Sequence, residues 1–386
     1  MNNRDFQYST TPTTAPQLQF TATVGDRYLV LADGQIGNAA GTAFDAIMYL
    51  PGGTDYWHQP VQPVVAGDIF SCPMMFDYTI IEAPPNNFDF TLVPGGSVYS
   101  NLIVCAFKLV DGEFASVDAS AASTSSATYV SLMTLEDSPG SGTITVPVAG
   151  DYLIRAVCNA KLNSSTNSFF VRLVVDGAAA PSYTEATKMA VSATVGGPWE
   201  AMVKLNLAAG THTVTIDVKT NGTDTATISF AKIVMLREDA FPRIFYLDSR
   251  SAANANTVYP TYTTKASGTL TARTQDKPHL LLSSWLSLES VNARIVYNRT
   301  LQDDTTALAE TINKMPAANI EFSHTALSAF TPTVGDHTFK IQGAKDATGA
   351  GTGNNTISQA AIALIQMSDD VTVRIRGGVL LGGTIL

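Results

Sequence analysis

Short runs in which apolar and polar residues alternate make up most of the sequence. In residues 143–148 the aliphatic side chains fall on every second position, and residues 213–218 do the same. A period of two is typical of a β-strand with one buried face. Turn dipeptides such as Asp176-Gly177 and Asn221-Gly222 separate these runs, because Gly, Asn and Asp tolerate the positive φ angles of tight turns. The pattern predicts an all-β fold of short strands, as in a β-sandwich or jelly roll.

One stretch departs from this pattern. Residues 305–315 have a sequence suited to a helix, and Pro316 follows directly. Proline ends a helix because it lacks the backbone N–H group and its ring clashes with the preceding turn. We therefore expect one short helix, inserted in a loop of the last third of the chain.

A repeat of about 125 residues organises the chain. The matched segments of the middle and last thirds are residues 151–154 and 278–281, 171–174 and 293–296, 210–216 and 335–341, and 227–229 and 356–358. The first third fits more loosely, through the likeness of residues 25–30 to residues 150–154. Matches that keep their order while their offsets drift indicate copies of one fold that differ by loop insertions. The sequence therefore predicts three tandem β-sandwich domains.

The matches also set the expected domain boundaries. These are residues 1–18 for an extended N-terminal arm, 19–117 for the first β-sandwich, 128–238 for the second, and 252–386 for the third, which ends in a C-terminal strand or arm. Residues 118–127 consist mostly of Ser and Ala and would link the first two domains. Residues 239–251 contain five large apolar side chains, so we expect this second joint to pack against a domain.

The composition narrows the possible partners. Charged residues make up 15% of the chain and the formal net charge is −10. Binding to nucleic acid phosphates or to an anionic membrane needs a basic surface, and the sequence shows no basic stripe. No apolar stretch approaches the roughly 18 residues of a membrane span, and we find no secretory signal sequence. We expect neither a nucleic acid nor a membrane as partner.

The three cysteines, Cys72, Cys105 and Cys158, lie far apart in apolar runs. Free cysteines in such runs behave as small hydrophobic residues. The spacing fits neither a disulfide framework nor a metal site, and it favours a chain that folds in a reducing cytoplasm.

No constellation of catalytic residues emerges, so we expect no enzymatic activity, no cofactor and no metal. His212 and His337 occupy the same position in two copies, which fits either a repeated ligand site or a turn residue that opens a strand. Asp303 and Asp304 are adjacent carboxylates that fit either a weak calcium site or a solvated loop. Asp369 and Asp370 form a second such pair.

Aromatic residues supply the candidate interface positions. Tyr56 and Trp57 follow a Pro-Gly-Gly turn, where they could form a sugar-stacking platform or anchor an interface. Phe245 and Tyr246 lie in the apolar second joint. We take these four as candidate interface residues.

The second copy resembles a known module. Residues 146–154 read Val-Pro-Val-Ala-Gly-Asp-Tyr-Leu-Ile, residues 170–177 read Phe-Val-Arg-Leu-Val-Val-Asp-Gly, and residues 228–236 form an apolar closing run. This order resembles the tumour-necrosis-factor-like jelly roll, in which a Pro-x-x-Gly-x-Tyr strand precedes a Leu-x-Val-x-Gly strand and an apolar last strand. The resemblance covers about 100 residues.

Modules of this kind, poor in cysteine and rich in Thr, Ala and Gly, are similar to virion proteins of tailed bacteriophages. Capsid decoration (cement) proteins, head fibres and tail accessory proteins are examples. The resemblance implies a virion component, assembled in the host cytoplasm, whose partners are major capsid or tail subunits. The alternative is a module of a phage fibre or tail that binds a glycan or a host receptor.

Jelly rolls of this type commonly associate in threes. Three copies could form a pseudo-trimer within one chain, or the chain could trimerise copy by copy. We expect a homotrimer.

Overall fold

The structure is a computed structural model of the chain. It describes residues 6–11, 17–37, 44–50, 55–61, 69–81, 86–93, 98–118, 122–164, 167–179, 186–189, 197–249, 253–255, 257–270, 278–289, 295–314, 320–346 and 355–367.

The regular secondary structure of the described residues is almost entirely β-strand, as the sequence predicts. The first module holds β1 (Phe6–Thr11), β2 (Gln17–Phe20), β3 (Arg27–Gly37), β4 (Phe44–Tyr49), β5 (Asp55–Val61), β6 (Ile69–Ser71), β7 (Met74–Thr79), β8 (Asn86–Val93) and β9 (Val98–Lys108). The second holds β10 (Phe114–Asp118), β11 (Ala122–Thr124), β12 (Val130–Thr134), β13 (Ile144–Val146), β14 (Gly150–Leu162), β15 (Ser168–Val175), β16 (Ala178–Ala179), β17 (Ala186–Met189), β18 (Gly197–Leu207), β19 (Gly210–His212), β20 (Val214–Lys219) and β21 (Ala226–Arg237). After the 3-10 turn η2 (Glu238–Ala240), the third holds β22 (Arg243–Ser249), β23 (Ala253–Ala255), β24 (Thr263–Leu270), β25 (His279–Glu289), β26 (Ile295–Gln302), β27 (Thr306–Lys314), β28 (Ile320–Phe330), β29 (His337–Lys345) and β30 (Asn355–Gln366).

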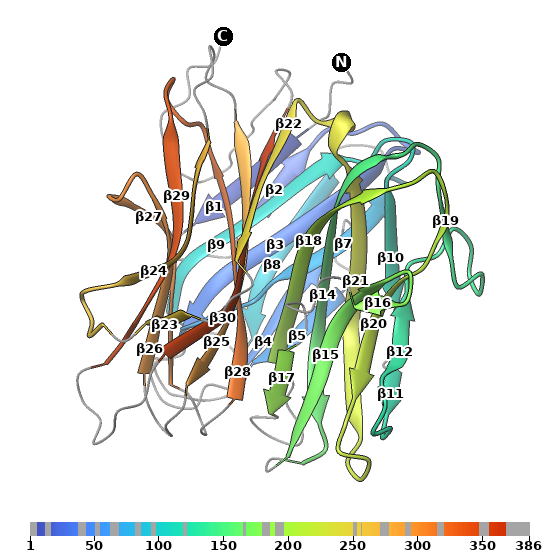
Figure 1. Ribbon diagram of the computed structural model, residues 1–386. Helices are drawn as coiled ribbons and strands as arrows, with labels where there is room; N and C mark the ends of the chain where they lie inside the picture. The colour runs from blue at the N-terminus through green and yellow to red at the C-terminus, as the bar shows by residue number, and fades with distance from the viewer. Residues whose placement is uncertain are drawn as a thin grey trace.

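Each module is a sandwich of two antiparallel sheets with the same strand order. The second module has an inner sheet β10-β21-β14-β18 and an outer sheet β12-β20-β15-β16, and the third repeats these as β22-β30-β25-β28 and β24-β29-β26-β27. The first module follows the same order with β1-β9-β3, extended by β6 and β7, and with β2-β8-β4-β5. Because β6 also pairs with β27, the inner strands of the first module and the outer strands of the third form one continuous nine-stranded sheet. Figure 1 shows the second module at the right, the third at the left and the blue strands of the first behind them. The threefold repeat of one β-sandwich is therefore present in the fold.

At the two joints between modules, the strand pairing assigns residues to modules differently from the expected domain boundaries. β10 and β11 pair with β21, so the chain enters the second module before residue 118. β22 pairs along its length with β30, which makes the apolar second joint a strand of the third module. In the N-terminal segment expected to be an arm, β1 pairs with β9. The expected C-terminal strand or arm beyond residue 367 lies outside the described residues.

Two predictions of detail were wrong. Residues 306–314 form strand β27, paired with β26, instead of a helix. Buried Ala309 and Thr311 alternate with more exposed neighbours, because sheet pairing prevails over local helix propensity.

The predicted match of residues 171–174 to residues 293–296 was off by five positions. In the second module Val175 pairs with Val214, and at the equivalent place in the third module Gln302 pairs with Phe339. Arg172 is therefore equivalent to Arg299. A short apolar pattern fits more than one register.

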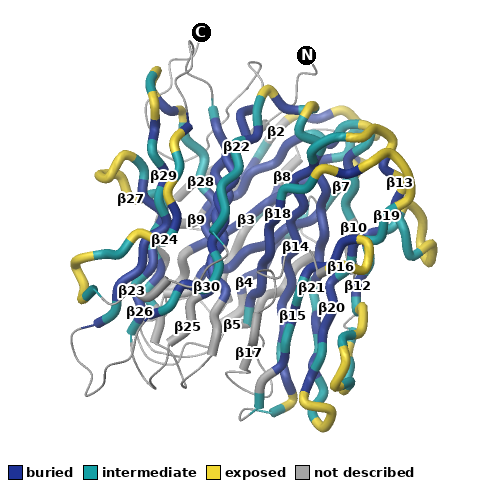
Figure 2. Tube along the Cα trace, in the orientation of Figure 1, coloured by how far each residue is buried: buried dark blue, intermediate teal, exposed yellow. Residues whose placement is uncertain are grey.

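The inner sheets are buried on both faces. Along β14, Tyr152, Ile154, Ala156 and Cys158 belong to the core of the second module, whereas Leu153 and Val157 belong to a cluster that also contains Leu29 and Phe107 of the first module and Ile365 of the third. Figure 2 shows the dark blue, buried course of β3, β14 and β18, while exposed segments gather at loops. The three modules thus surround a shared apolar core. Among the described residues, no helix is long and apolar enough to cross a membrane.

Candidate functional site at the junction of three modules

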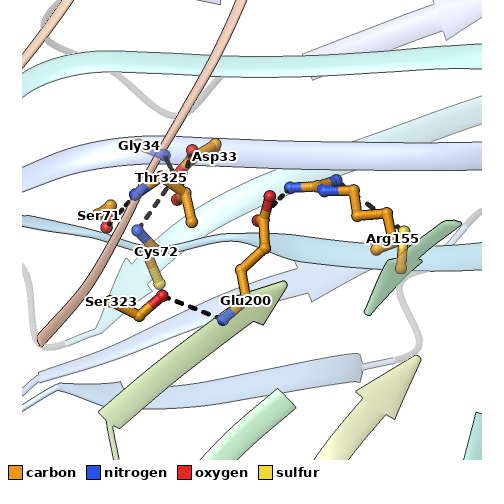
Figure 3. Close-up of polar contacts among 9 residues, drawn as sticks. Asp33, Gly34, Ser71, Cys72, Arg155, Glu200, Ser323 and Thr325 are labelled. Atoms are coloured by element: carbon orange, nitrogen blue, oxygen red, sulfur yellow. Dashed lines mark hydrogen bonds and ion pairs between the residues drawn. The ribbon is translucent and has the colours of Figure 1, made fainter. Parts of the chain in front are cut away.

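Charged and hydroxyl side chains from all three modules meet inside this shared core. Asp33 lies on β3, Arg155 on β14, Glu200 on β18 and Thr325 on β28, and at most 3% of each residue's surface is exposed. Arg155 and Glu200 stand on the faces of their strands that also carry Leu153, Val157 and Met202 into the shared core. A charge at such a position costs several kcal/mol unless partners compensate it. We call this group the polar junction (Figure 3).

Arg155 and Glu200 form the ion pair of the polar junction. Nη2 of Arg155 lies 2.6 Å from Oε2 of Glu200, and the two side chains are 3% and 0% exposed. Burial is the largest influence on the pKa of Arg155 and lowers it, but the charge of Glu200, the hydrogen bond to Glu200 and the charge of Asp33 act together and raise this pKa overall. The guanidinium also reaches the first module, where Nη1 lies 3.9 Å from Sδ of Met75.

Asp33 is the second buried acid of the polar junction. Its Oδ1 accepts the backbone N–H groups of Gly34 at 2.7 Å and Cys72 at 3.1 Å. Its Oδ2 accepts the hydroxyl of Thr325 at 2.9 Å, which joins the first module to the third. Burial raises the pKa of Asp33 to about 7, although the hydrogen bond from Thr325 opposes that rise.

Two serines complete the links between modules. The backbone N–H of Thr325 donates to the hydroxyl of Ser71 at 3.0 Å. The backbone N–H of Glu200 donates to the hydroxyl of Ser323 at 3.0 Å, which joins the second module to the third. Each pair of modules therefore shares at least one polar contact at the junction, and these contacts fix the distance and the register between sheets.

A second charged group connects the first two modules. Lys232 on β21 is fully buried, and its Nζ forms an ion pair with Oδ1 of Asp77 on β7. Oδ2 of Asp77 accepts Nε of Arg27 at 2.8 Å, and Nη2 of Arg27 donates to the carbonyl of Ala115 at 3.0 Å. Both carboxylate oxygens of Asp77 are thus engaged by basic side chains of different modules, while burial lowers the pKa of Lys232 well below its ordinary value.

A surface hollow of about 460 Å³ lies beside this second group. It is lined by Arg27, residues 109–115, Glu136 and Asp137. The carboxylate of Glu136 accepts the backbone N–H groups of Gly140 at 2.6 Å and Gly142 at 3.0 Å. Arg27 and Glu136 are therefore occupied by contacts within the fold.

The arrangement at the polar junction suits positioning better than chemistry. The charged groups are almost completely buried among the described residues, and both acids accept hydrogen bonds from within the chain. In the part of the chain that the structure describes, no group of three or more His, Cys, Asp or Glu side chains could hold a metal ion. All three cysteines are free and buried, and burial raises the pKa of Cys105 to about 12.

The candidate interface residues lie in two places. Phe245 packs against the core of the third module, and the hydroxyl of Tyr246 donates to the carbonyl of Met202 in the second module at 3.1 Å. Tyr56 and Trp57 belong to β5, and their side chains lie outside the described residues. Tyr246 therefore stands at an interface between modules of one chain.

The paired positions of the two copies have structural partners. Nδ1 of His212 faces Asp176 and Nδ1 of His337 faces Asp303, so both histidines join turns to strands. Asp304 forms an ion pair with Lys340 at 2.5 Å. The second acidic pair, Asp369 and Asp370, lies outside the described residues.

The sequence contains a signal for the polar junction and for the second charged group, in the form of single charges within apolar strands. Arg155 interrupts the apolar run of residues 152–158, Glu200 stands between Trp199 and Ala201, and Lys232 interrupts residues 231–236. A single charge within a strand whose neighbours on both sides are apolar indicates a buried charge with a partner in another element.

No protein-family model matches the chain, and no curated protein matches it. Among solved structures, infectious bursal disease virus (Gt strain) matches at 9% identity and a TM-score of 0.25, over 96% of this chain and 74% of that one. The triple jelly roll protein of an archaeal virus matches at 10% identity and a TM-score of 0.22, over 96% and 92%. PNGase F, a glycosylasparaginase from Flavobacterium meningosepticum, matches at 7% identity and a TM-score of 0.35, over 68% and 98%.

Proposed function

We propose that the chain is a non-enzymatic structural protein of a virus particle. In this proposal it decorates or cements the capsid of a tailed bacteriophage, or forms an accessory part of the head or tail. The observation that supports it best is the polar junction inside the shared core. Three modules joined by buried ion pairs and hydrogen bonds make one rigid block, which suits a subunit of an assembly that withstands force better than it suits a hinged enzyme.

The partners in this proposal are major capsid or tail subunits, with neither nucleic acid nor membrane. The expected homotrimer stays a prediction. Because the inner sheets of the three modules already face one another, a homotrimer would have to use the outer sheets, the loops or the terminal segments.

The alternative, glycan or receptor binding, would be favoured by exposed aromatic clusters in matching loops of the copies. Equivalent tyrosines do occur beside β12 and β24, but cations cover their rings. The guanidinium of Arg172 lies 3.6 Å from the ring centre of Tyr129, and that of Arg299 lies 3.8 Å from the ring centre of Tyr262. These contacts take up ring faces on which a sugar would stack, so the two tyrosines favour the structural role.

The test is mass spectrometry and cryo-electron microscopy of purified particles from the source of the chain. We expect the protein in the particle at regular lattice positions, with its compact three-module block contacting more than one neighbouring subunit. Its absence from particles would overturn the virion role. Its presence only at a vertex or on the tail would overturn the cementing role and would call for glycan-array and receptor-binding assays.

A further inference from the structure

The two equivalent histidines, His212 and His337, have surroundings that favour a second proton on the ring. Nδ1 of His212 lies 2.8 Å from Oδ2 of Asp176, and its Nε2 lies 2.8 Å from the carbonyl oxygen of Ala208. A carboxylate and a carbonyl oxygen only accept hydrogen bonds. Both contacts are satisfied together only when both ring nitrogens donate, which requires the imidazolium form.

The third module repeats this geometry. Nδ1 of His337 lies 2.6 Å from Oδ2 of Asp303, and its Nε2 lies 2.8 Å from the carbonyl oxygen of Thr333. The side-chain amide nitrogen of Gln302 lies farther from the same Nδ1, at 3.3 Å. Two copies of one arrangement, in modules whose surrounding sequence differs, indicate that the arrangement itself is built into the module.

Each histidine joins three pieces of chain. The aspartate stands in the turn after an outer strand, β15 or β26, with a positive φ of 52° at Asp176 and 50° at Asp303. Its other oxygen accepts the backbone N–H of Thr213 at 3.0 Å or of Thr338 at 2.8 Å, next to the following outer strand. The carbonyl partner of the histidine belongs to the chain that has just left an inner strand, β18 or β28. The histidine therefore ties the inner sheet to the outer sheet at one end of the sandwich.

We propose that the His212–Asp176 and His337–Asp303 pairs are proton-dependent latches, which hold the sheet ends of the second and third modules closed when the imidazoles are charged and release them as the pH rises. A neutral imidazole can donate from one nitrogen only, so deprotonation breaks either the contact to the aspartate or the contact to the carbonyl. The latch goes beyond the proposed structural role and does not depend on it.

The surrounding charges set the direction of the switch. Asp176 is the charged group that faces His212, while Asp303 and the more distant Asp336 face His337. Burial lowers the pKa of both histidines, but their hydrogen bonds to the aspartates and carbonyls outweigh it, and both pKa values lie above the ordinary 6.5. A histidine with a raised pKa in the folded state contributes its full stabilisation below about pH 6.5 and loses it as the pH rises through the folded pKa.

The test is an NMR titration of the full chain with ¹⁵N-labelled histidine between pH 5 and pH 9. His212→Gln and His337→Gln assign the two signals. We expect both rings to titrate above pH 6.5 and to carry two protons below their raised pKa values. Asp303→Asn should lower the pKa of His337 by about one unit or more, since a carboxylate partner is lost. Asp304→Asn is the matched control, because its carboxylate pairs with Lys340 instead, and it should leave the pKa of His337 in place.

A second readout follows the release itself. Hydrogen exchange of the Thr213 and Thr338 amides, corrected for intrinsic exchange rates, should show protection that falls as each histidine deprotonates. Either histidine titrating at or below 6.5 overturns the proposal. So does an equal pKa of His337 in the Asp303→Asn and Asp304→Asn variants, or amide protection that does not change with pH.

Discussion

The inner and outer sheets of the second module place similar residues in different physical environments. Arg155 on inner strand β14 and Arg172 on outer strand β15 each pair with one acid, Glu200 and Asp217 respectively. The Arg155 side chain is 3% exposed and that of Arg172 is 21% exposed. A pair that keeps contact with water is worth little, whereas a buried charge that loses its partner is costly. An arginine–carboxylate pair therefore contributes little on the outer sheet, whereas on the inner sheet each partner depends on the other.

The largest expected effect is the loss of one partner from the buried pair. Arg155→Ala leaves the Glu200 carboxylate uncompensated in the shared core and should lower the free energy of unfolding by about 3–5 kcal/mol. Arg172→Ala is the matched control on the outer sheet, with an expected loss of about 1 kcal/mol or less. Urea unfolding followed by tryptophan fluorescence measures both. Equal losses in the two variants would erase the contrast between the sheets.

The next effect concerns the pH dependence of the polar junction. The folded pKa of Asp33, about 7, lies above the ordinary 3.8. The folded state therefore binds this proton more tightly, and stability falls as the pH rises from about 4 to 7, by roughly 4 kcal/mol in total. Asp33→Asn preserves the shape and should remove this slope. The test is to measure the unfolding free energies of wild type and variant from pH 4 to pH 8 and to compare them. A difference that stays constant over this range would show that Asp33 is not protonated in the folded state.

A single hydroxyl tests the link between the first and third modules. Thr325→Val removes the hydrogen bond to Asp33 and should cost about 1–3 kcal/mol, because the carboxylate loses one of its three donors. It should also raise the pKa of Asp33 further, since this hydrogen bond lowers it. Thr215 on β20 donates to Asp217 at 2.8 Å on the outer sheet, and Thr215→Val should cost about 0.5 kcal/mol or less. Chemical denaturation of both variants gives the comparison, which would fail if Thr215→Val proved the more harmful.

The smallest expected effect comes from replacing the whole ion pair. Arg155→Met combined with Glu200→Met should change the free energy of unfolding by only about 1 kcal/mol, because the cost of burying two charges disappears with their attraction. Nε of Arg155 and Oε1 of Glu200 have no hydrogen-bond partner among the described residues, which adds to that cost. Chemical denaturation of the double variant and of Arg155→Ala, under the same conditions, gives the two free energies of unfolding to compare. A double variant as unstable as Arg155→Ala would mean that the pair stabilises the fold in its own right.

The pattern of residues predicted the class of fold and the repeat, because alternation and turn residues act locally. It could not predict the shared core. The apolar run of residues 231–236 predicts a closing strand, but it does not show whether one face of that strand is buried or both. The packing of the three modules determines this. Residues 306–314 show the same limit, since a segment that could form a helix becomes β27 when β26 offers a partner. Arg155 and Glu200 are 45 residues apart in sequence, and nothing in either segment indicates the other as its partner.

The shared core also affects the order in which the chain can be completed during synthesis. The core of the second module comes almost entirely from residues 133–235, so it can close as soon as β21 has been made. The cluster that holds the first module together includes Ile365 and Met367, and Ile69 on β6 pairs with Ile312 on β27. Most of that cluster nevertheless comes from the first module itself, between Leu18 and Leu109, so this module can begin to close early. Its contacts with the third module form only once the last strands have been made, so the shared core is expected to be completed late in synthesis.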